Sequence, residues 1–266
     1  MLDSLGSVWM NRPKTVELKN KLKNRKLTLG SWITIGNPIV AEVMARSGLE
    51  WITIDMEHSV ITLDVAQNLI RTIELNGCIP LVRVHENDPY FIKRVMDAGA
   101  HGVIIPMVCT KEDAEKAVSA VKYPPQGTRG VGLARAQDYG FGFESYKKWL
   151  EKESIVIVQI EHIDAVKNLE EILSVKGVDG FIVGPYDISG SMGTPGDFEN
   201  KKFKATISKI MSIATKCKKP AGFHVIPPDD KEINRYIKIG YKFIAISLDT
   251  LILGSLYRDI IKKIKK

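Results

Sequence analysis

Apolar runs and amphipathic stretches alternate along the chain. Each apolar run is continuous, without regular polar positions, which is typical of strands buried on both faces of a parallel sheet. We predict strands at Leu29–Ile33, Trp51–Asp55, Pro80–Val84, Gly102–Pro106, Ile155–Glu161, Gly180–Pro185, Pro220–Val225 and Phe243–Leu248. The stretches of helical periodicity between them are Leu63–Leu75, Pro89–Ala98, Lys111–Val121, Ala165–Leu173, Lys202–Lys216, Lys231–Ile239 and Leu251–Ile264.

This order of elements predicts an α/β fold of the (β/α)8 or TIM-barrel type. Eight strands with helices between them fit such a barrel in both number and chain length. The alternative is a doubly wound open sheet, but the sequence has neither a G-x-G-x-x-G motif after the first strand nor a Walker A motif. We predict one barrel domain over residues 29–266. An N-terminal extension over residues 1–28 would add a helix at Thr15–Arg25.

Composition narrows the class of protein. The 266 residues are 44% hydrophobic and 26% charged, which is ordinary for a globular protein. The three cysteines show no C-x-x-C spacing, which indicates a reducing compartment and argues against disulfides. No apolar run is long enough to cross a bilayer, and the N-terminus lacks the apolar core of a signal peptide. We expect a cytoplasmic enzyme with no membrane partner.

The net charge of +7 at first suggests a nucleic-acid partner, but its location argues against one. Residues 1–26 carry +5 and residues 258–266 carry +4, so the remainder of the chain carries −2. A surface that binds nucleic acid would place its basic residues on the folded body. We therefore expect solvated terminal helices and no nucleic-acid partner.

Ionisable residues gather where the predicted strands end. They are Asp55, His58, Arg83, Glu161, Asp187 and His224. Because the active site of a barrel lies at the carboxyl ends of its strands, we expect these side chains to converge on one rim. Each residue has a structural alternative. His58 or Asp187 would cap a helix, Arg83 would pair with Glu57, and Glu161 would form a salt bridge.

Glu161 and Asp187 together indicate a site for a divalent metal ion. Two carboxylates with open positions suit Mg²⁺ or Mn²⁺, whose remaining ligands are water and substrate oxygens. Neither residue lies in a cluster of Cys and His, so a structural zinc site is not expected. Most lysines lie in predicted helices, tails or loops, which favours a metal over a lysine Schiff base.

Six segments resemble one enzyme family in sequence and in order. They are DMEHS (Asp55–Ser59), VRVHENDP (Val82–Pro89), MDAGAHGVIIPMV (Met96–Val108), YPPQGTRGVG (Tyr123–Gly132), VQIE (Val158–Glu161) and VDGFIVGPYDISGSMG (Val178–Gly193). Over Leu29 to Thr250 the chain resembles the metal-dependent (class II) pyruvate aldolases of the 4-hydroxy-2-oxoheptanedioate and 2-dehydro-3-deoxyglucarate type, the HpcH/HpaI family. This family belongs to the phosphoenolpyruvate/pyruvate superfamily of barrels.

The resemblance implies an aldehyde-lyase that cleaves or forms 4-hydroxy-2-oxo acids through a metal-bound pyruvate enolate. Glu161 and Asp187 would hold Mg²⁺ or Mn²⁺, with Co²⁺ as a further option. His58 would be the general base, acting through water. Asp97 would raise the basicity of His58, and Asp55 would belong to the same network. Arg83 would stabilise the oxyanion. The pyruvyl group would be bound by Gln159, Gly184, Pro185, Tyr186 and Asp187.

Some features depart from the family pattern or stay open. Tyr186 stands where relatives often have a smaller or amide residue, and His85 stands where many have an apolar residue or proline. The sequence does not indicate the aldehyde acceptor, and Glu57 has no assigned role. Alternatives are an oxaloacetate decarboxylase, an acyl-CoA lyase of the citrate or malyl type, and a barrel that binds without turnover. The resemblance also implies a homo-oligomer, commonly a hexamer with an exchanged terminal helix.

Overall fold

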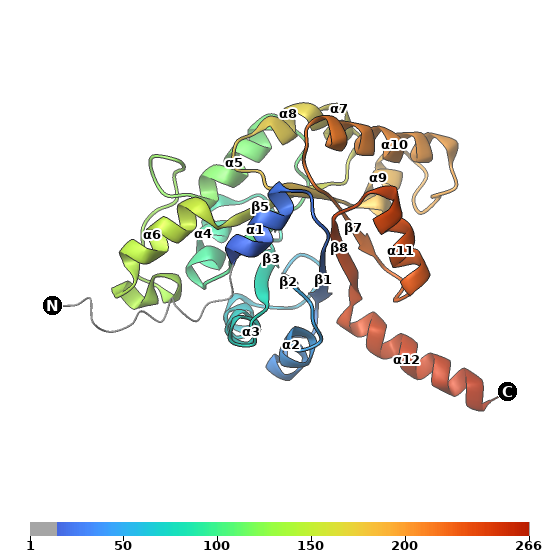
Figure 1. Ribbon diagram of the computed structural model, residues 1–266, viewed down its shortest axis with the longest axis horizontal. Coiled ribbons are helices and arrows are strands. Elements are labelled where there is room, and N and C mark those ends of the chain that lie inside the picture. The colour runs from blue at the N-terminus through green and yellow to red at the C-terminus, as the bar shows by residue number, and fades with distance from the viewer. Residues whose placement is uncertain (1–14, 266) are drawn as a thin grey trace.

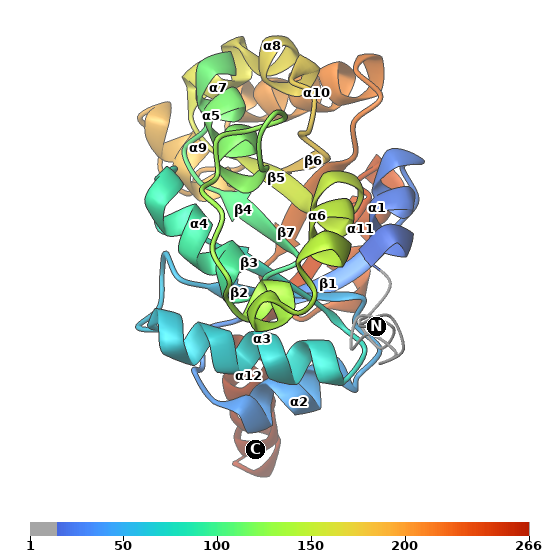
Figure 2. The same ribbon diagram turned by 90° about the vertical axis from the view of Figure 1, so that its left-hand side faces the viewer.

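Eight parallel strands form a closed barrel, as Figures 1 and 2 show. The computed structural model describes residues 15–265. The strands are β1 (Thr28–Ile33), β2 (Trp51–Asp55), β3 (Ile79–Arg83), β4 (Gly102–Ile105), β5 (Ile155–Ile160), β6 (Gly180–Val183), β7 (Ala221–Val225) and β8 (Phe243–Leu248). Each strand pairs with its neighbours in sequence, and β8 closes on β1. The predicted (β/α)8 barrel is confirmed.

Helices connect the strands on the outside of the barrel, and two further helices stand at the two ends of the described chain (Figure 1). They are α1 (Thr15–Lys23), α2 (Pro38–Ala45), α3 (Leu63–Leu75), α4 (Pro89–Asp97), α5 (Lys111–Val121), α6 (Phe143–Lys152), α7 (Ile163–Lys167), α8 (Leu169–Ser174), α9 (Pro185–Ser191), α10 (Lys201–Lys216), α11 (Asp230–Ile239) and α12 (Asp249–Ile264), with a 3-10 segment, η2 (Arg135–Gly140). Several begin at a side-chain cap. For example, Asp88 accepts hydrogen bonds from the amides of Tyr90 and Phe91 at the start of α4.

The helix predictions were incomplete. Helices α2, α6 and α9 and the segment η2 were not predicted. The single helix predicted at Ala165–Leu173 is two helices, α7 and α8, which meet at Asn168. The side-chain amide of Asn168 donates to the carbonyl of Cys109 at 2.9 Å. Cys109 is far from Asn168 in the sequence, so helical periodicity could not predict this hydrogen bond.

Helix α1 closes the amino-terminal end of the barrel. Leu18 and Leu22 of α1 are buried in one cluster with residues of the barrel interior, including Trp51 and Phe243. The rings of Trp51 and Phe243 stack at 4.0 Å between centroids. The helix ends at Lys23, two residues earlier than predicted, and Arg25 adopts a positive φ of 51°. The predicted additional helix therefore contributes to the core of the barrel.

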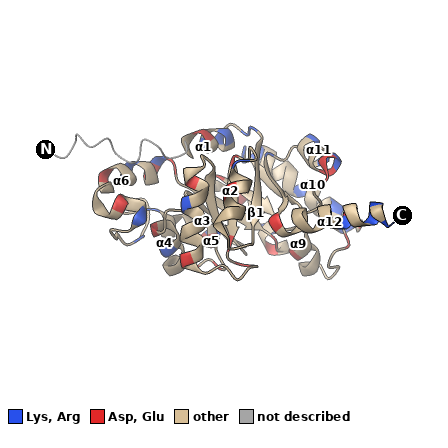
Figure 3. Ribbon diagram, turned by 90° about the horizontal axis from the view of Figure 1, so that it is seen from below, with Lys and Arg blue, Asp and Glu red and all other residues tan. Residues whose placement is uncertain are grey.

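Helix α12 projects from the body of the molecule (Figures 1 and 2). Its large apolar side chains are exposed, namely Ile252, Leu253, Leu256, Tyr257, Ile260, Ile261 and Ile264. Basic side chains follow toward its end, including Lys262 and Lys263 in the last turn (Figure 3). None of the helices in the described part of the chain is both long enough and apolar enough to span a membrane.

Candidate active site

The carboxyl ends of β2 and β3 place an acid directly opposite a base. Asp55 and Arg83 are register partners in the two strands. The guanidinium donates from Nε to Asp55 Oδ1 at 2.9 Å and from Nη2 to Oδ2 at 2.6 Å. Such a two-point contact fixes the plane of the guanidinium as well as its position. Arg83 is 12% exposed, so its charge faces a site that is largely shielded from water.

Asp55 also shapes the loop that carries His58. Its Oδ1 accepts hydrogen bonds from the backbone amides of Glu57 at 3.1 Å and of His58 at 3.2 Å. The hydroxyl of Ser59 donates to the Asp55 carbonyl and stabilises the same turn. The imidazole of His58 is 68% exposed. Asp55 therefore positions His58 through the backbone, and no hydrogen bond or ion pair joins the side chains of these two described residues.

Glu57 completes a small charged network at this rim. Its Oε2 lies 3.1 Å from Arg83 Nη1 and 3.8 Å from His58 Nε2. Burial raises the pKa of Glu57 to about 7, against the attraction of Arg83, and the nearby Glu161, Asp55 and Asp187 raise it further. The ion pair between Arg83 and Glu57 that the sequence suggested is therefore formed, beside the two-point contact between Arg83 and Asp55. Near neutral pH Glu57 can hold or release a proton.

Glu161 follows β5 and is fixed by two donors. The backbone amide of Met107, a residue with a positive φ of 51°, donates to Glu161 Oε1 at 2.6 Å. The amide of Gln159 donates to Oε2. Burial raises the pKa of Glu161, whereas these two hydrogen bonds lower it. The carboxylate is buried with no basic partner, so the salt bridge considered from the sequence is not formed within the described residues.

Gly184 brings Glu161 and Asp187 together. A Cβ built on this glycine would lie 2.7 Å from Glu161 Cβ, 3.0 Å from Glu161 Oε2 and 3.7 Å from Asp187 Oδ2. Oxygens of both carboxylates therefore border one small space that only glycine leaves open. Asp187 lies in the first turn of α9, whose N-cap is Gly184, so Asp187 is not itself the cap considered from the sequence.

The space at Gly184 suits a hard divalent cation. Carboxylate oxygens are the ligands that Mg²⁺ and Mn²⁺ prefer. Residues 15–265 contain no cluster of three or more His, Cys, Asp or Glu suited to a metal ion. A cation held by Glu161 and Asp187 alone would leave several positions to water and substrate, which is the usual arrangement for Mg²⁺.

A cavity of about 270 Å³ lies over the same end of the barrel, and we call it the barrel cavity. Its lining includes Asp55, His58, Arg83, Gln159, Gly184, Pro185, Tyr186 and Asp187. Glu161 is outside this lining and borders an adjoining open depression together with Asp187 and Tyr186. The structure therefore brings all but two of the predicted site residues to one cavity, with Glu161 at its edge.

Two buried polar atoms in the barrel cavity have no hydrogen-bond partner among the described residues. They are Trp32 Nε1, a donor, and Gln159 Oε1, an acceptor. The Arg83 guanidinium lies over the Trp32 ring at 4.3 Å from its centroid. Unpaired buried polar atoms are rare in folded proteins because they cost free energy. Each of the two residues therefore brings an unpaired polar group to the wall of the barrel cavity.

His224, on the inner face of β7, lines the barrel cavity as an uncharged residue. Its Nε2 is 2.9 Å from the Ser247 carbonyl, to which it donates. Burial lowers the pKa of His224 to about 4, and the nearby Arg83 lowers it further. The ring packs against Trp32 at 5.3 Å between centroids. The sequence indicated His224 as a strand-end residue but gave it no role.

Asp97 is the predicted site residue that the chain does not bring to the cavity. It is the last residue of α4, which starts beyond β3 and runs back toward the amino end of β4, so it lies at the end of the barrel opposite His58. Its Oδ1 accepts from Arg129 Nη2 at 2.6 Å. Within the described chain no hydrogen bond or ion pair joins Asp97 to His58. The expected support of His58 by Asp97 is not formed within one chain.

Sequence reasoning missed three contributors to this site. Trp32 was read only as an apolar strand residue, and Met107 acts through its backbone amide, which no side-chain pattern reveals. Glu57 was noticed but left without a role. Its position within DMEHS, between Asp55 and His58, was the available signal.

Two curated relatives cover nearly the whole chain. The 5-keto-4-deoxy-D-glucarate aldolase of Escherichia coli O157:H7 is 31% identical over 250 residues, which is 94% of this chain and 97% of the relative. The hydroxypyruvate/pyruvate aldolase of Roseobacter denitrificans is 32% identical over 249 residues, which is 93% of this chain and 96% of the relative. These similarities confirm the predicted class of enzyme, a lyase of the aldolase type.

Solved structures agree with the barrel. An HpcH/HpaI aldolase/citrate lyase family protein from Burkholderia cenocepacia has a TM-score of 0.88 and 29% identity, covering 94% of this chain and 99% of that one. The family model described as HpcH/HpaI aldolase/citrate lyase matches residues 28–254. The resemblance seen in the sequence is confirmed, and the chain belongs to the HpcH/HpaI aldolase/citrate lyase family.

Proposed function

We propose that this protein is a metal-dependent aldolase that forms or cleaves 4-hydroxy-2-oxo acids through the enolate of pyruvate. The observation that carries the proposal is the space at Gly184, where oxygens of Glu161 and Asp187 meet beside the barrel cavity. The aldolase names of the relatives support the same chemistry.

Glu161 and Asp187 would hold the cation, with Mg²⁺ or Mn²⁺ as the expected ions and Co²⁺ as a further option. Bound there, the cation supplies Lewis-acid chemistry that lowers the cost of negative charge on the substrate's keto oxygen. The amides of Met107 and Gln159 orient the Glu161 carboxylate for this purpose. Outer contacts of this kind normally tune both the affinity and the geometry of a metal site.

The remaining groups of the cavity would bind substrate and move a proton. His58 is exposed to solvent and would accept a proton from the methyl group of pyruvate through a water molecule. Arg83, fixed by Asp55, would place positive charge beside the oxygen that becomes negative. The free Gln159 Oε1 and the backbone from Gly184 to Tyr186 would contact the pyruvyl group.

Exchange of the pyruvate methyl protons with deuterated water tests the proposal, because it requires no aldehyde. We expect exchange to depend on Mg²⁺ or Mn²⁺, to be abolished in Glu161→Gln and to fall strongly in His58→Ala. Glu171→Gln, on the outer helix α8, is the matched control and should exchange normally. Normal exchange in the presence of a chelator would refute a metal-dependent mechanism.

The family description also includes citrate lyase, so a related reaction is the second candidate. Decarboxylation of oxaloacetate would pass through the same enolate and release carbon dioxide. Comparing that release with cleavage of a 4-hydroxy-2-oxo acid separates the two activities. A homo-oligomer, a cytoplasmic location and the absence of a nucleic-acid or membrane partner remain predictions from the sequence.

A further inference from the structure

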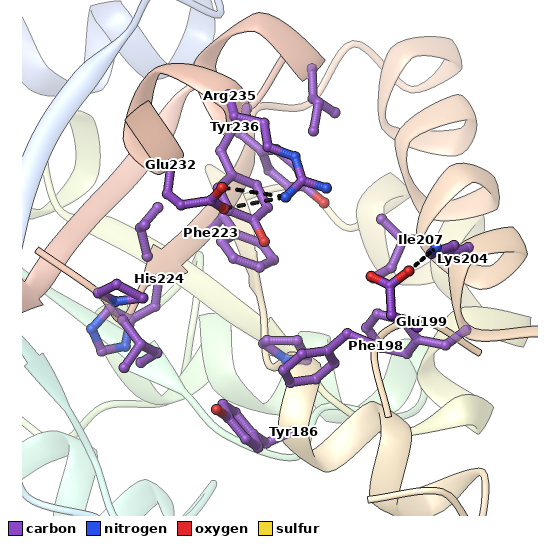
Figure 4. A pocket seen from close by; sticks show the side chains of 17 residues that line it. Tyr186, Phe198, Glu199, Lys204, Ile207, Phe223, His224, Glu232, Arg235 and Tyr236 are labelled. Atoms are coloured by element: carbon purple, nitrogen blue, oxygen red, sulfur yellow. Dashed lines mark hydrogen bonds and ion pairs between the residues drawn. The ribbon is translucent and has the colours of Figure 1, made fainter. Parts of the chain in front are cut away.

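A second cavity of about 390 Å³ lies outside strand β7, between α10 and α11, and we call it the side pocket (Figure 4). Aromatic and aliphatic side chains form most of its lining, including Tyr186, Phe198, Phe203, Ile207, Phe223, Tyr236, Ile239 and Tyr241. Its volume is within the range of small-molecule sites. Nothing in the proposed reaction at Glu161 and Asp187 requires this space.

Incomplete packing of α11 explains why the pocket is there. The helix has a clear apolar face, yet none of its 10 residues is fully buried. Tyr236 of α11 stacks on Phe223 of β7 at 3.9 Å between ring centroids, which anchors the helix on the barrel. The space beside this stack, toward Ile207 on α10, is left unfilled (Figure 4). The pocket opens to solvent, since Tyr186 and Ile239 in its lining are exposed, so a ligand can enter it from outside.

The side pocket adjoins the barrel cavity. Pro185, Tyr186, His224 and Ile226 line both. Tyr186 is 55% exposed, and its ring meets that of Phe198 edge-on at 4.9 Å between centroids. The residue after Tyr186 is the proposed metal ligand Asp187. A molecule bound at Asp187 would therefore need only to extend past Tyr186 and His224 to enter the side pocket.

The charges around the side pocket are balanced among themselves. Lys204 pairs with Glu199 at 2.5 Å, and Arg235 pairs with Glu232 at 3.3 Å (Figure 4). His224, at the junction, donates to a backbone carbonyl and is uncharged at neutral pH. The lining thus offers no unpaired cation for a carboxylate or phosphate. Its chemistry fits an uncharged, apolar group.

We propose that the side pocket binds the apolar tail of the acceptor aldehyde. This inference rests on the proposed function. In the reaction the methyl carbon of pyruvate loses a proton and forms a bond to the aldehyde carbon, and the aldehyde oxygen takes up a proton to become the 4-hydroxyl. The tail takes no part in this exchange. It contributes binding energy and selects aldehydes with several apolar carbons over short ones.

Filling the side pocket from α10 tests the proposal at a distance from the reacting groups. Ile207→Trp places a large side chain in the pocket, and Ser208→Trp, at the next and exposed position, is the matched control. The acceptors are 3-phenylpropanal and acetaldehyde, each with pyruvate and Mn²⁺. We expect Ile207→Trp to lower kcat/KM for 3-phenylpropanal about tenfold or more, because a pocket discriminates by that much for a few apolar carbons. The value for acetaldehyde should change less than twofold.

The outcomes separate this inference from the proposed function. If the wild type exchanges pyruvate protons but does not favour 3-phenylpropanal, or if Ile207→Trp affects both aldehydes equally, the side pocket is not an acceptor site. If exchange itself is absent, the proposed function fails. Calorimetry with 3-phenylpropan-1-ol then decides whether the pocket binds apolar chains, and binding that Ile207→Trp leaves unchanged overturns the site. Ile207→Phe provides a smaller obstruction if Ile207→Trp lowers the melting temperature.

Discussion

Replacing Gly184 with alanine tests whether Glu161 and Asp187 act as one cation site. The added Cβ would lie 2.7 Å from Glu161 Cβ and 3.0 Å from Glu161 Oε2, closer than non-bonded carbon and oxygen atoms tolerate. Since Glu161 is held by Met107 and Gln159, the carboxylate can yield only by breaking these hydrogen bonds. We expect the substitution to move Oε2 of Glu161 away from Asp187, although neither carboxylate residue is itself replaced.

We expect two effects, a loss of stability from the crowded Cβ and a loss of metal affinity from the displaced Glu161 carboxylate. Overpacking of a rigid site costs about 1–3 kcal/mol in the free energy of unfolding. Disturbing the groups that orient a metal ligand typically weakens metal binding about 10-fold to 100-fold. Gly190→Ala, in the same helix α9, is the control, because a Cβ there meets nothing within 4 Å. Alanine in place of a helical glycine should stabilise the protein by up to about 1 kcal/mol.

Calorimetric titration with Mn²⁺ and exchange of the pyruvate methyl protons measure the two consequences. Gly184→Ala should bind Mn²⁺ more weakly and exchange slowly, with partial recovery at high Mn²⁺, whereas Gly190→Ala should match the wild type in both assays. Wild-type affinity for Mn²⁺ in Gly184→Ala would refute a cation site at this position. A loss in both variants would show that α9 as a whole had been disturbed.

Two further substitutions probe buried groups. Because burial raises the pKa of Glu57 from 4.5 to about 7, the folded protein binds more protons than the unfolded chain between these values, so its unfolding free energy should fall as pH rises through this window. Denaturant unfolding with chelator present should show a smaller fall in Glu57→Gln, and an equal fall would contradict the assigned cause. Tyr241→Phe removes a buried hydroxyl that has no hydrogen-bond partner within residues 15–265, so it should raise the unfolding free energy by about 1 kcal/mol, measured by urea denaturation. A lower stability would show that the hydroxyl has a partner in solution.

The barrel could be predicted because its strands are encoded locally. Continuous apolar runs such as Trp51–Asp55 and Phe243–Leu248 were placed at their observed bounds. Helix α2 was missed because PIVAEVMA has few polar residues and so shows little periodicity. The break at Asn168 was missed, and the hydrogen bond that Asn168 donates there goes to the carbonyl of Cys109, which is distant in sequence. An element whose bounds depend on tertiary contacts cannot be predicted from the local sequence pattern.

The candidate site could be predicted only as far as the barrel topology determines it. Strand ends meet at one rim, so Asp55, Arg83 and Asp187 were placed together correctly. Asp97 came from the resemblance alone, and its place at the end of α4 puts it at the opposite end of the barrel from His58. The role of Trp32 depends on the Arg83 guanidinium that lies over its ring, and the role of the Met107 amide depends on backbone geometry. Neither role can be inferred from the residues that are adjacent in sequence.

The register of β2 against β3 has a consequence for how this family can change. Asp55 and Arg83 face each other because of one hydrogen-bonding alignment in a closed sheet. In a barrel without edges, no strand can slip by a residue unless the others readjust around the ring, and a slip would turn every side chain to the other face. The relative position of Asp55 and Arg83 therefore depends on the register of all the strands in the barrel. Rim loops that carry none of the site's side chains can therefore vary while Asp55 and Arg83 stay aligned.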